Sequence, residues 1–130
     1  MTAVREAAAV REALRTYALT LPDAYEDHPW GESVVKVRKK IFVFFGTDGT
    51  DEPGTGMKLT VSQPIALAQP GVTPSGYGLG KAGWVSVRIS GDTPFEMLSD
   101  WVDESYRVVA PKALVAPKAL VALLGGSPDE

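Results

Sequence analysis

The clearest pattern of hydrophobic and polar positions lies in residues 84–90, where the two kinds of side chain alternate. The three β-branched residues of this segment would point to one side of an extended chain, and Trp84, Ser86, Arg88 and Ser90 to the other. A period of two is typical of a strand that buries one face and leaves the other in water. The segment therefore predicts a sheet that is covered on one side.

Three further segments predict strands of the same sheet. Residues 33–38 and 41–45 are rich in β-branched and aromatic side chains, and they predict a hairpin that turns at residues 39–40. Residues 57–61 predict another strand by the same alternation. The polar positions of these strands would share the outward side with Trp84, and they are Lys36, Arg38, Lys58 and Thr60.

Two long segments and one short segment predict helices. Residues 3–19 repeat apolar side chains at spacings of three and four, with Arg5, Arg11, Glu12 and Arg15 on the polar side. Residues 64–69 predict a short helical segment. A helix from residue 94 to about residue 109 is predicted by its apolar stripe and by Thr93 with Glu96, which form the pattern of a capping box.

The remaining segments predict loops and a distinct C-terminus. Residues 23–32, 46–56 and 70–83 are rich in polar residues, glycine and proline. The hexapeptide VAPKAL occurs twice in succession over residues 109–120, and its second proline, Pro117, is expected to begin a short final helix. Residues 127–130 are expected to form a disordered tail.

Together these elements predict an α+β fold, in which an antiparallel sheet of about four or more strands carries helices on one face. A chain of 130 residues with 45% hydrophobic and 22% charged side chains is expected to form one domain, here over residues 1–126. No segment approaches the roughly 20 apolar residues that cross a bilayer, and charges interrupt the apolar positions of the N-terminus. We expect a cytoplasmic protein without membrane contact. The sequence has no cysteine, which excludes disulfides and cysteine-ligated zinc.

The distribution of charge indicates an anionic partner, although the net charge is −3. Residues 34–90 carry seven basic and three acidic side chains, whereas residues 20–33 carry four acidic and no basic ones. Basic side chains beside an aromatic ring can hold phosphates and stack on a base. The candidate nucleic-acid-binding residues are Lys36, Arg38, Lys39, Lys40, Lys58, Lys81, Trp84 and Arg88. The alternative interpretation of these residues is a solvated sheet face.

The glycine-rich segment before residue 84 is a second candidate site, because Gly76, Gly78, Gly80 and Lys81 invite comparison with phosphate loops. Phosphate loops follow a strand and open into a helix, whose amides then face the anion. Here the loop leads into a strand instead. We therefore interpret these glycines as residues that allow positive φ angles or close backbone approach in a loop. We expect no cofactor.

His28 is the single histidine, and it lies beside Glu26 and Asp27 with Glu32 nearby. A metal site requires that such groups converge, which residues adjacent in a loop need not do. Ser33 and Ser75 do not lie in the G-x-S-x-G pattern of a nucleophile elbow. We therefore expect neither a metal site nor a catalytic triad.

The sequence resembles the MmcQ/YjbR family of small bacterial proteins over LPDAYEDHPWGESVVKV, GYGLGKAGWVSVRI and DWVDESYRVVAPKALVA. The most specific points are the segment Pro29-Trp30-Gly31, Lys81 with Trp84, and Ser105 with Tyr106. The resemblance implies a fold similar to that of frataxin (CyaY) and a DNA-binding function. Many relatives have histidine and asparagine where this chain has Gly78 and Gly80, so the role of those two positions does not carry over.

The frataxin-like fold raises iron binding as an alternative, because frataxins bind iron through an acidic helix surface. The first predicted helix offers Glu6 and Glu12 among three arginines, which is not the converging set of carboxylates that a hard cation needs. Iron binding is therefore not expected.

The leading hypothesis is non-catalytic binding of DNA, or of single-stranded nucleic acid, by a protein that is a monomer by default. One alternative is a protein that binds a small molecule or an anion, possibly an enzyme, in a cleft between the glycine-rich segment and His28. Another alternative is a protein-interaction module.

Overall fold

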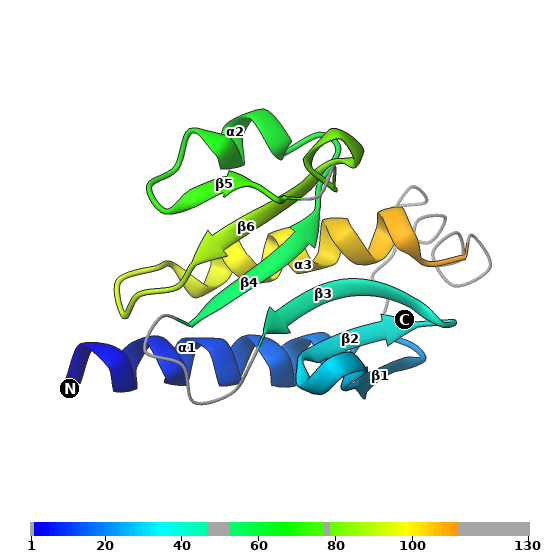
Figure 1. Ribbon diagram of the computed structural model, residues 1–130, viewed down its shortest axis with the longest axis horizontal. Helices are drawn as coiled ribbons and strands as arrows, with labels where there is room; N and C mark the ends of the chain where they lie inside the picture. Colours follow the sequence, from blue (N-terminus) through cyan, green and yellow to red (C-terminus); the bar gives the residue numbers. More distant parts are fainter. Residues whose placement is uncertain (1, 47–52, 77–78, 112–130) are drawn as a thin grey trace, which may run out of the picture.

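The computed structural model describes residues 2–46, 53–76 and 79–111. Six antiparallel strands form one sheet in the order β1-β2-β3-β4-β6-β5, and two long helices lie against one of its faces (Figure 1). The strands are β1 (Ala24–Asp27), β2 (Ser33–Val37), β3 (Lys40–Gly46), β4 (Gly54–Lys58), β5 (Val72–Pro74) and β6 (Trp84–Arg88). The helices are α1 (Thr2–Leu19), α2 (Gln63–Leu67) and α3 (Phe95–Val109), with single 3₁₀ turns η1 (Pro29–Gly31) and η2 (Leu79–Ala82). The predicted α+β class is confirmed.

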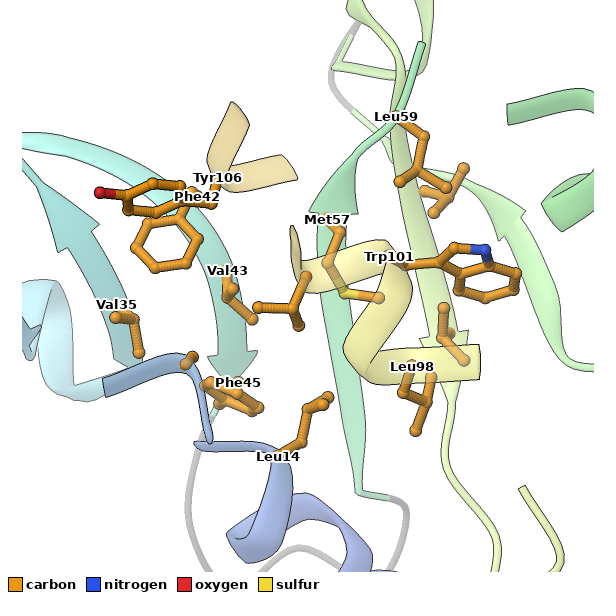
Figure 2. Packing of buried hydrophobic residues seen from close by; sticks show 14 of the residues in the cluster. Leu14, Val35, Phe42, Val43, Phe45, Met57, Leu59, Leu98, Trp101 and Tyr106 are labelled. Carbon is orange, nitrogen blue, oxygen red and sulfur yellow. The ribbon is translucent and has the colours of Figure 1, made fainter. Parts of the chain in front are cut away.

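The core lies between the sheet and helices α1 and α3 (Figure 2). Leu14 from α1 and Leu98 from α3 are fully buried against sheet residues such as Met57. Truncating a leucine or methionine at such a position to alanine costs about 2–5 kcal/mol, because transfer energy is lost and a cavity remains. The apolar residues at helical spacing that predict α1 and α3 are therefore the residues that bury these helices against the sheet. No helix among the described residues is long and apolar enough to span a membrane.

Arg11 departs from the prediction that it lies on the polar side of α1. The residue is 5% exposed, and its Nε and Nη2 atoms donate to the carbonyl oxygen of Phe45 at 3.0 and 2.8 Å. The pairing of β2 with β3 skips Phe45, since Ser33 faces Gly46 and Val34 faces Phe44. A bulge of this kind leaves a backbone group without a ladder partner, and here a buried guanidinium supplies the partner.

The β2–β3 hairpin turns one residue earlier than predicted. Arg38 and Lys39 occupy the two turn positions, and both have positive φ, at 50° and 72°. Two-residue hairpins favour this conformation because its twist matches that of the strands. The prediction of a turn at residues 39–40 is wrong because it relied on composition, and neither residue of the turn is the glycine or asparagine that marks this geometry.

The sequence also missed two strands and misplaced a third. β1 and β5 lie at the two edges of the sheet, within segments that were predicted to be loops. β4 begins at Gly54 and ends at Lys58, whereas residues 57–61 were predicted to form this strand. Thr60, which was expected on the outward sheet face, therefore follows the strand as an exposed residue.

Helix α3 begins at Phe95 without a capping side chain, so the predicted capping box at Thr93 is wrong. The Thr93 hydroxyl instead accepts the Ser90 amide at 2.9 Å and closes the preceding turn. The helix ends at Val109, as predicted, two residues before Pro111. The predicted final helix at Pro117 and the tail at residues 127–130 lie outside the described residues.

Four consecutive residues of α3 hold four other parts of the fold. The carboxylate of Asp103 accepts the Tyr17 hydroxyl on α1 at 2.6 Å, and that of Glu104 accepts the amides of Thr60 and Ser62 at 2.8 and 3.1 Å. Ser105 donates to the Phe42 carbonyl oxygen, and Tyr106 donates to the Pro22 carbonyl oxygen. This segment therefore has a structural role in joining the helix layer to the sheet.

Candidate functional site

The face of the sheet turned away from α1 and α3 carries most of the candidate residues, and we call it the outer face. The register of β4 with β6 places residues of the outer face side by side. Lys58 pairs with Trp84, Gly56 with Ser86 and Gly54 with Arg88. The intervening residues Val85 and Val87 belong to the core on the opposite side. The alternation predicted for β6 is therefore present.

Strands β4, β6 and β5, which form one half of the outer face, contribute no acidic side chain to it. Residues 53–91, which include these strands together with α2 and η2, contain no aspartate or glutamate. Apart from Trp84, the outer-face positions on these strands are small, hydroxylated or basic, and the hydroxyls of Ser75 and Ser86 lie 2.9 Å apart. We call this region the acid-free half.

Trp84 lies on the outer face, but it is not exposed there as predicted. Its side chain is 8% exposed, and its ring meets that of Phe44 edge to face, with centroids 5.1 Å apart. Gly56 lies on the strand between them, and a Cβ at that position would lie 3.6 Å from the Cβ of Phe44. A Cβ at Gly56 would therefore make an ordinary contact with Phe44, and the two rings meet across β4. Trp84 serves packing in this conformation and does not present a ring face for stacking.

The other half of the outer face pairs its bases with acids from around β1. Lys36 lies 2.7 Å from the carboxylate of Asp27, and Arg38 lies 2.9 Å from that of Asp23. The hydrogen bond from Lys36 lowers the pKa of Asp27, and the same bond raises the pKa of Lys36. Two of the predicted nucleic-acid-binding residues are therefore neutralised locally.

Glu26 gathers a second polar cluster at the edge of the sheet. Its Oε2 atom accepts the Ser33 hydroxyl at 2.6 Å and lies 3.0 Å from Arg15 and 3.1 Å from His28. The bond from Ser33, with Arg15 nearby, holds the pKa of Glu26 below its usual range. Both Ser33 and His28 bond to the carboxylate and not to each other, so this arrangement cannot activate the serine as a nucleophile.

Four lysines lie at one end of the sheet without an acidic partner among the described residues. Lys39 lies in the β2–β3 turn, Lys40 begins β3, Lys58 ends β4, and Lys81 lies in η2 just before β6. Antiparallel pairing brings the end of β2, the start of β3, the end of β4 and the start of β6 to the same end of the sheet. The β2–β3 hairpin and the upper end of β4 diverge there (Figure 1). We call these four residues the lysine end.

Other predicted groups are not brought together. His28 follows β1 at one edge of the sheet, whereas the glycine-rich segment lies between β5 and β6 at the other edge. A cleft shared by His28 and that segment is therefore absent from the part of the chain that the structure describes. The same ranges contain no group of three or more histidine, cysteine, aspartate or glutamate side chains that could hold a metal ion.

Sequence reasoning missed the acids that decide which bases are paired. The sequence predicts a loop at Asp23 and Asp27, and their partners Arg38 and Lys36 lie several residues away in the next hairpin. These ion pairs depend on the register of β1 with β2, which the sequence does not reveal. That register places Asp27 opposite Val34 and Tyr25 opposite Lys36. The concentration of four acids in residues 20–33 was the signal available beforehand.

The fold and this face define a class of small α+β proteins with an antiparallel sheet, two helices on one side and a polar face on the other. A model of the YjbR family matches residues 19–108, and the chain belongs to that family. The crystal structure of Deinococcus radiodurans protein DR2400, described by its DUF419 domain, is similar with a TM-score of 0.67 and 26% identity, covering 90% of this chain and 88% of that one. A Pseudomonas syringae protein shares the fold with a TM-score of 0.60 and 19% identity, covering 76% of this chain and 97% of that one. No curated protein matches the sequence.

Proposed function

We propose that this protein binds nucleic acid without catalysis, through phosphate contacts at the lysine end. The observation that carries the proposal is that Lys39, Lys40, Lys58 and Lys81 have no acidic partner within the described ranges, while the segment bearing two of them lacks acids altogether. Unpaired lysines keep their full charge available for phosphates, and each phosphate contact releases condensed counterions.

The burial of Trp84 shapes the expected mode of binding. A buried ring cannot stack on an unpaired base, so base stacking on Trp84 is not part of the proposed interaction. Lysine is a flexible point charge that contacts phosphate without fixing a base sequence. The proposed binding is therefore electrostatic and independent of sequence, with a dissociation constant on the order of 10⁻⁴ to 10⁻⁶ M.

Fluorescence polarisation with labelled single-stranded and duplex oligonucleotides at several salt concentrations tests the proposal. Contacts with about four phosphates of a duplex predict a slope of log affinity against log salt of about −3 to −4. Replacing Lys58 and Lys81 together by glutamine should reduce that slope by about 2. Arg107→Gln is a control for the loss of a cation elsewhere, since it removes one exposed cation from α3 on the helix side of the molecule.

Two results would overturn the proposed function. One is that the unaltered protein shows no binding to either oligonucleotide at low salt. The other is that the Lys58→Gln/Lys81→Gln variant binds with the same affinity and salt slope as the unaltered protein. Circular dichroism of each variant excludes unfolding as the cause of a loss.

A further inference from the structure

We infer that Asp23 and Asp27 act as built-in competitors of the anionic ligand and confine it to the lysine end. The inference rests on the proposed function, since it concerns the extent of the same binding site. The two carboxylates would exclude phosphates from Lys36 and Arg38, which otherwise extend the basic surface along β2.

The geometry of the Asp27 pair favours this role. Its Oδ2 atom lies 2.7 Å from Lys36 Nζ, while its Oδ1 atom accepts the amide of His28 at 2.8 Å. The carboxylate is thus held by the backbone as well as by the lysine. The side chain of Lys36 is 20% exposed and that of Asp27 is 47% exposed, so a ligand approaching this pair meets the acid more readily than the base.

The Asp23 pair works in the same way at the hairpin turn. Asp23 Oδ2 accepts from Arg38 Nε at 3.0 Å and lies 2.9 Å from Nη2, so two donors of the guanidinium face one carboxylate. Asp23 and Arg38 both have positive φ, at 61° and 50°, which is uncommon for residues other than glycine. The contact therefore joins two residues in unusual backbone conformations and places an acid beside the turn that carries Lys39.

The contrast with the acid-free half defines the boundary of the site. Lys36 on β2 and Lys58 on β4 both lie on the outer face, yet one has a bound carboxylate and the other has none within the described ranges. A phosphate at Lys36 would have to displace Asp27 and then remain near its charge. Like charges at short range disfavour such a contact, so the acids specify where a polyanion can lie.

Neutralising the competitors should enlarge the site. In the double variant Asp23→Asn/Asp27→Asn, Lys36 and Arg38 become available for about two additional phosphates. The salt slope should then become steeper by about 2, and the ratio of affinities at about 50 and 200 mM salt should grow about tenfold. The matched control is Asp92→Asn/Glu96→Gln, which changes the net charge equally at exposed positions before and within α3.

Lys36 provides a second test that does not depend on the double variant folding. Lys36→Gln in the otherwise unaltered protein should leave affinity and salt slope unchanged, because the lysine is occupied by Asp27. Asp27→Asn should increase the affinity and the salt slope by making Lys36 available. Adding Lys36→Gln to Asp27→Asn should abolish that increase. Titration calorimetry or polarisation with one duplex oligonucleotide measures both.

The outcomes separate this inference from the proposed function. If the unaltered protein does not bind, the proposed function fails. If it binds with a slope set by Lys58 and Lys81, but the Asp23→Asn/Asp27→Asn variant gains no more than the Asp92→Asn/Glu96→Gln control, the competitor role alone is wrong. The competitor role is equally wrong if Lys36→Gln weakens the unaltered protein as much as Lys58→Gln does.

Discussion

Ser105 donates its hydroxyl proton to the carbonyl oxygen of Phe42 at 2.6 Å, while its oxygen accepts the amide of Lys58 at 2.9 Å. Val43 faces Met57 and Phe44 faces Gly56, so continuing this register would place Phe42 opposite Lys58. The hydroxyl from α3 therefore sits where a hydrogen bond between β3 and β4 would otherwise form. This insertion is the point from which the two strands diverge.

Ser105→Ala should lower the free energy of unfolding by about 2–4 kcal/mol, because a buried carbonyl and an amide lose their partner. The matched control is Ser99→Ala on the same helix, whose hydroxyl donates to the Glu96 carbonyl oxygen at the exposed surface. That control should change stability by less than about 0.5 kcal/mol. Urea denaturation measures both. Equal losses of stability for the two substitutions would show that β3 and β4 form a direct hydrogen bond when the Ser105 hydroxyl is removed.

Gly83→Ala should destabilise the protein by at least about 3 kcal/mol. Gly83 has φ of +104°, and a Cβ there would lie 2.3 Å from the carbonyl oxygen of Leu59, which is backbone and cannot move aside alone. Gly76→Ala is the matched control in the same glycine-rich segment, since a Cβ at Gly76 meets no atom within 4 Å. Thermal denaturation measures the melting temperature of both variants. Equal melting temperatures for Gly83→Ala and Gly76→Ala would contradict the expectation.

Tyr17 should make stability depend on pH in the alkaline range. Burial and the hydrogen bond to Asp103 raise the pKa of Tyr17 to about 12, from an unfolded value of about 10. A raised folded pKa means that the contribution to stability is complete below about pH 10 and is lost as the pH rises toward 12. The stability difference between the unaltered protein and Tyr17→Phe should therefore shrink across this window.

Urea denaturation at a series of alkaline pH values checks the Tyr17 expectation. Tyr25→Phe is the control, because Tyr25 is an exposed tyrosine on β1. A constant difference for Tyr17→Phe would mean that the Asp103 carboxylate does not bind the hydroxyl in solution.

The parts of the fold that sequence predicted are those with long periodic patterns. Helices α1 and α3 and strand β6 each bury one side against the core, and burial of one side is what periodicity reports. β1 and β5 have four and three residues, too few for a period to be recognised. The predicted start of β4 is too late because Gly54 and Gly56 disfavour strands by composition, whereas in the fold both glycines pair with residues of β6.

The candidate site was predicted less completely, because side-chain pairing depends on tertiary contacts. Composition identified the basic positions, but it could not show that Lys36 and Arg38 lie beside acids from the segment around β1. Alternation placed Trp84 on the correct face, but it could not show that a ring from β3 would cover it across a glycine. The burial of Arg11 could not be predicted for the same reason, since its partner is the carbonyl of Phe45, 34 residues away in the sequence.

The four consecutive contacts of α3 also set an order in which the chain can complete its fold. Ser105 bonds a residue 63 positions earlier, Tyr106 one 84 positions earlier, and Asp103 one 86 positions earlier. Contacts so distant in sequence form slowly, because long segments must be closed before the bonds compensate. During synthesis, the strands from β1 to β6 emerge before any of these partners exists. The finished arrangement of helix and sheet must therefore wait until Tyr106 has left the ribosome. In a nascent chain that stalls before α3, only α1 can cover the apolar side of the sheet.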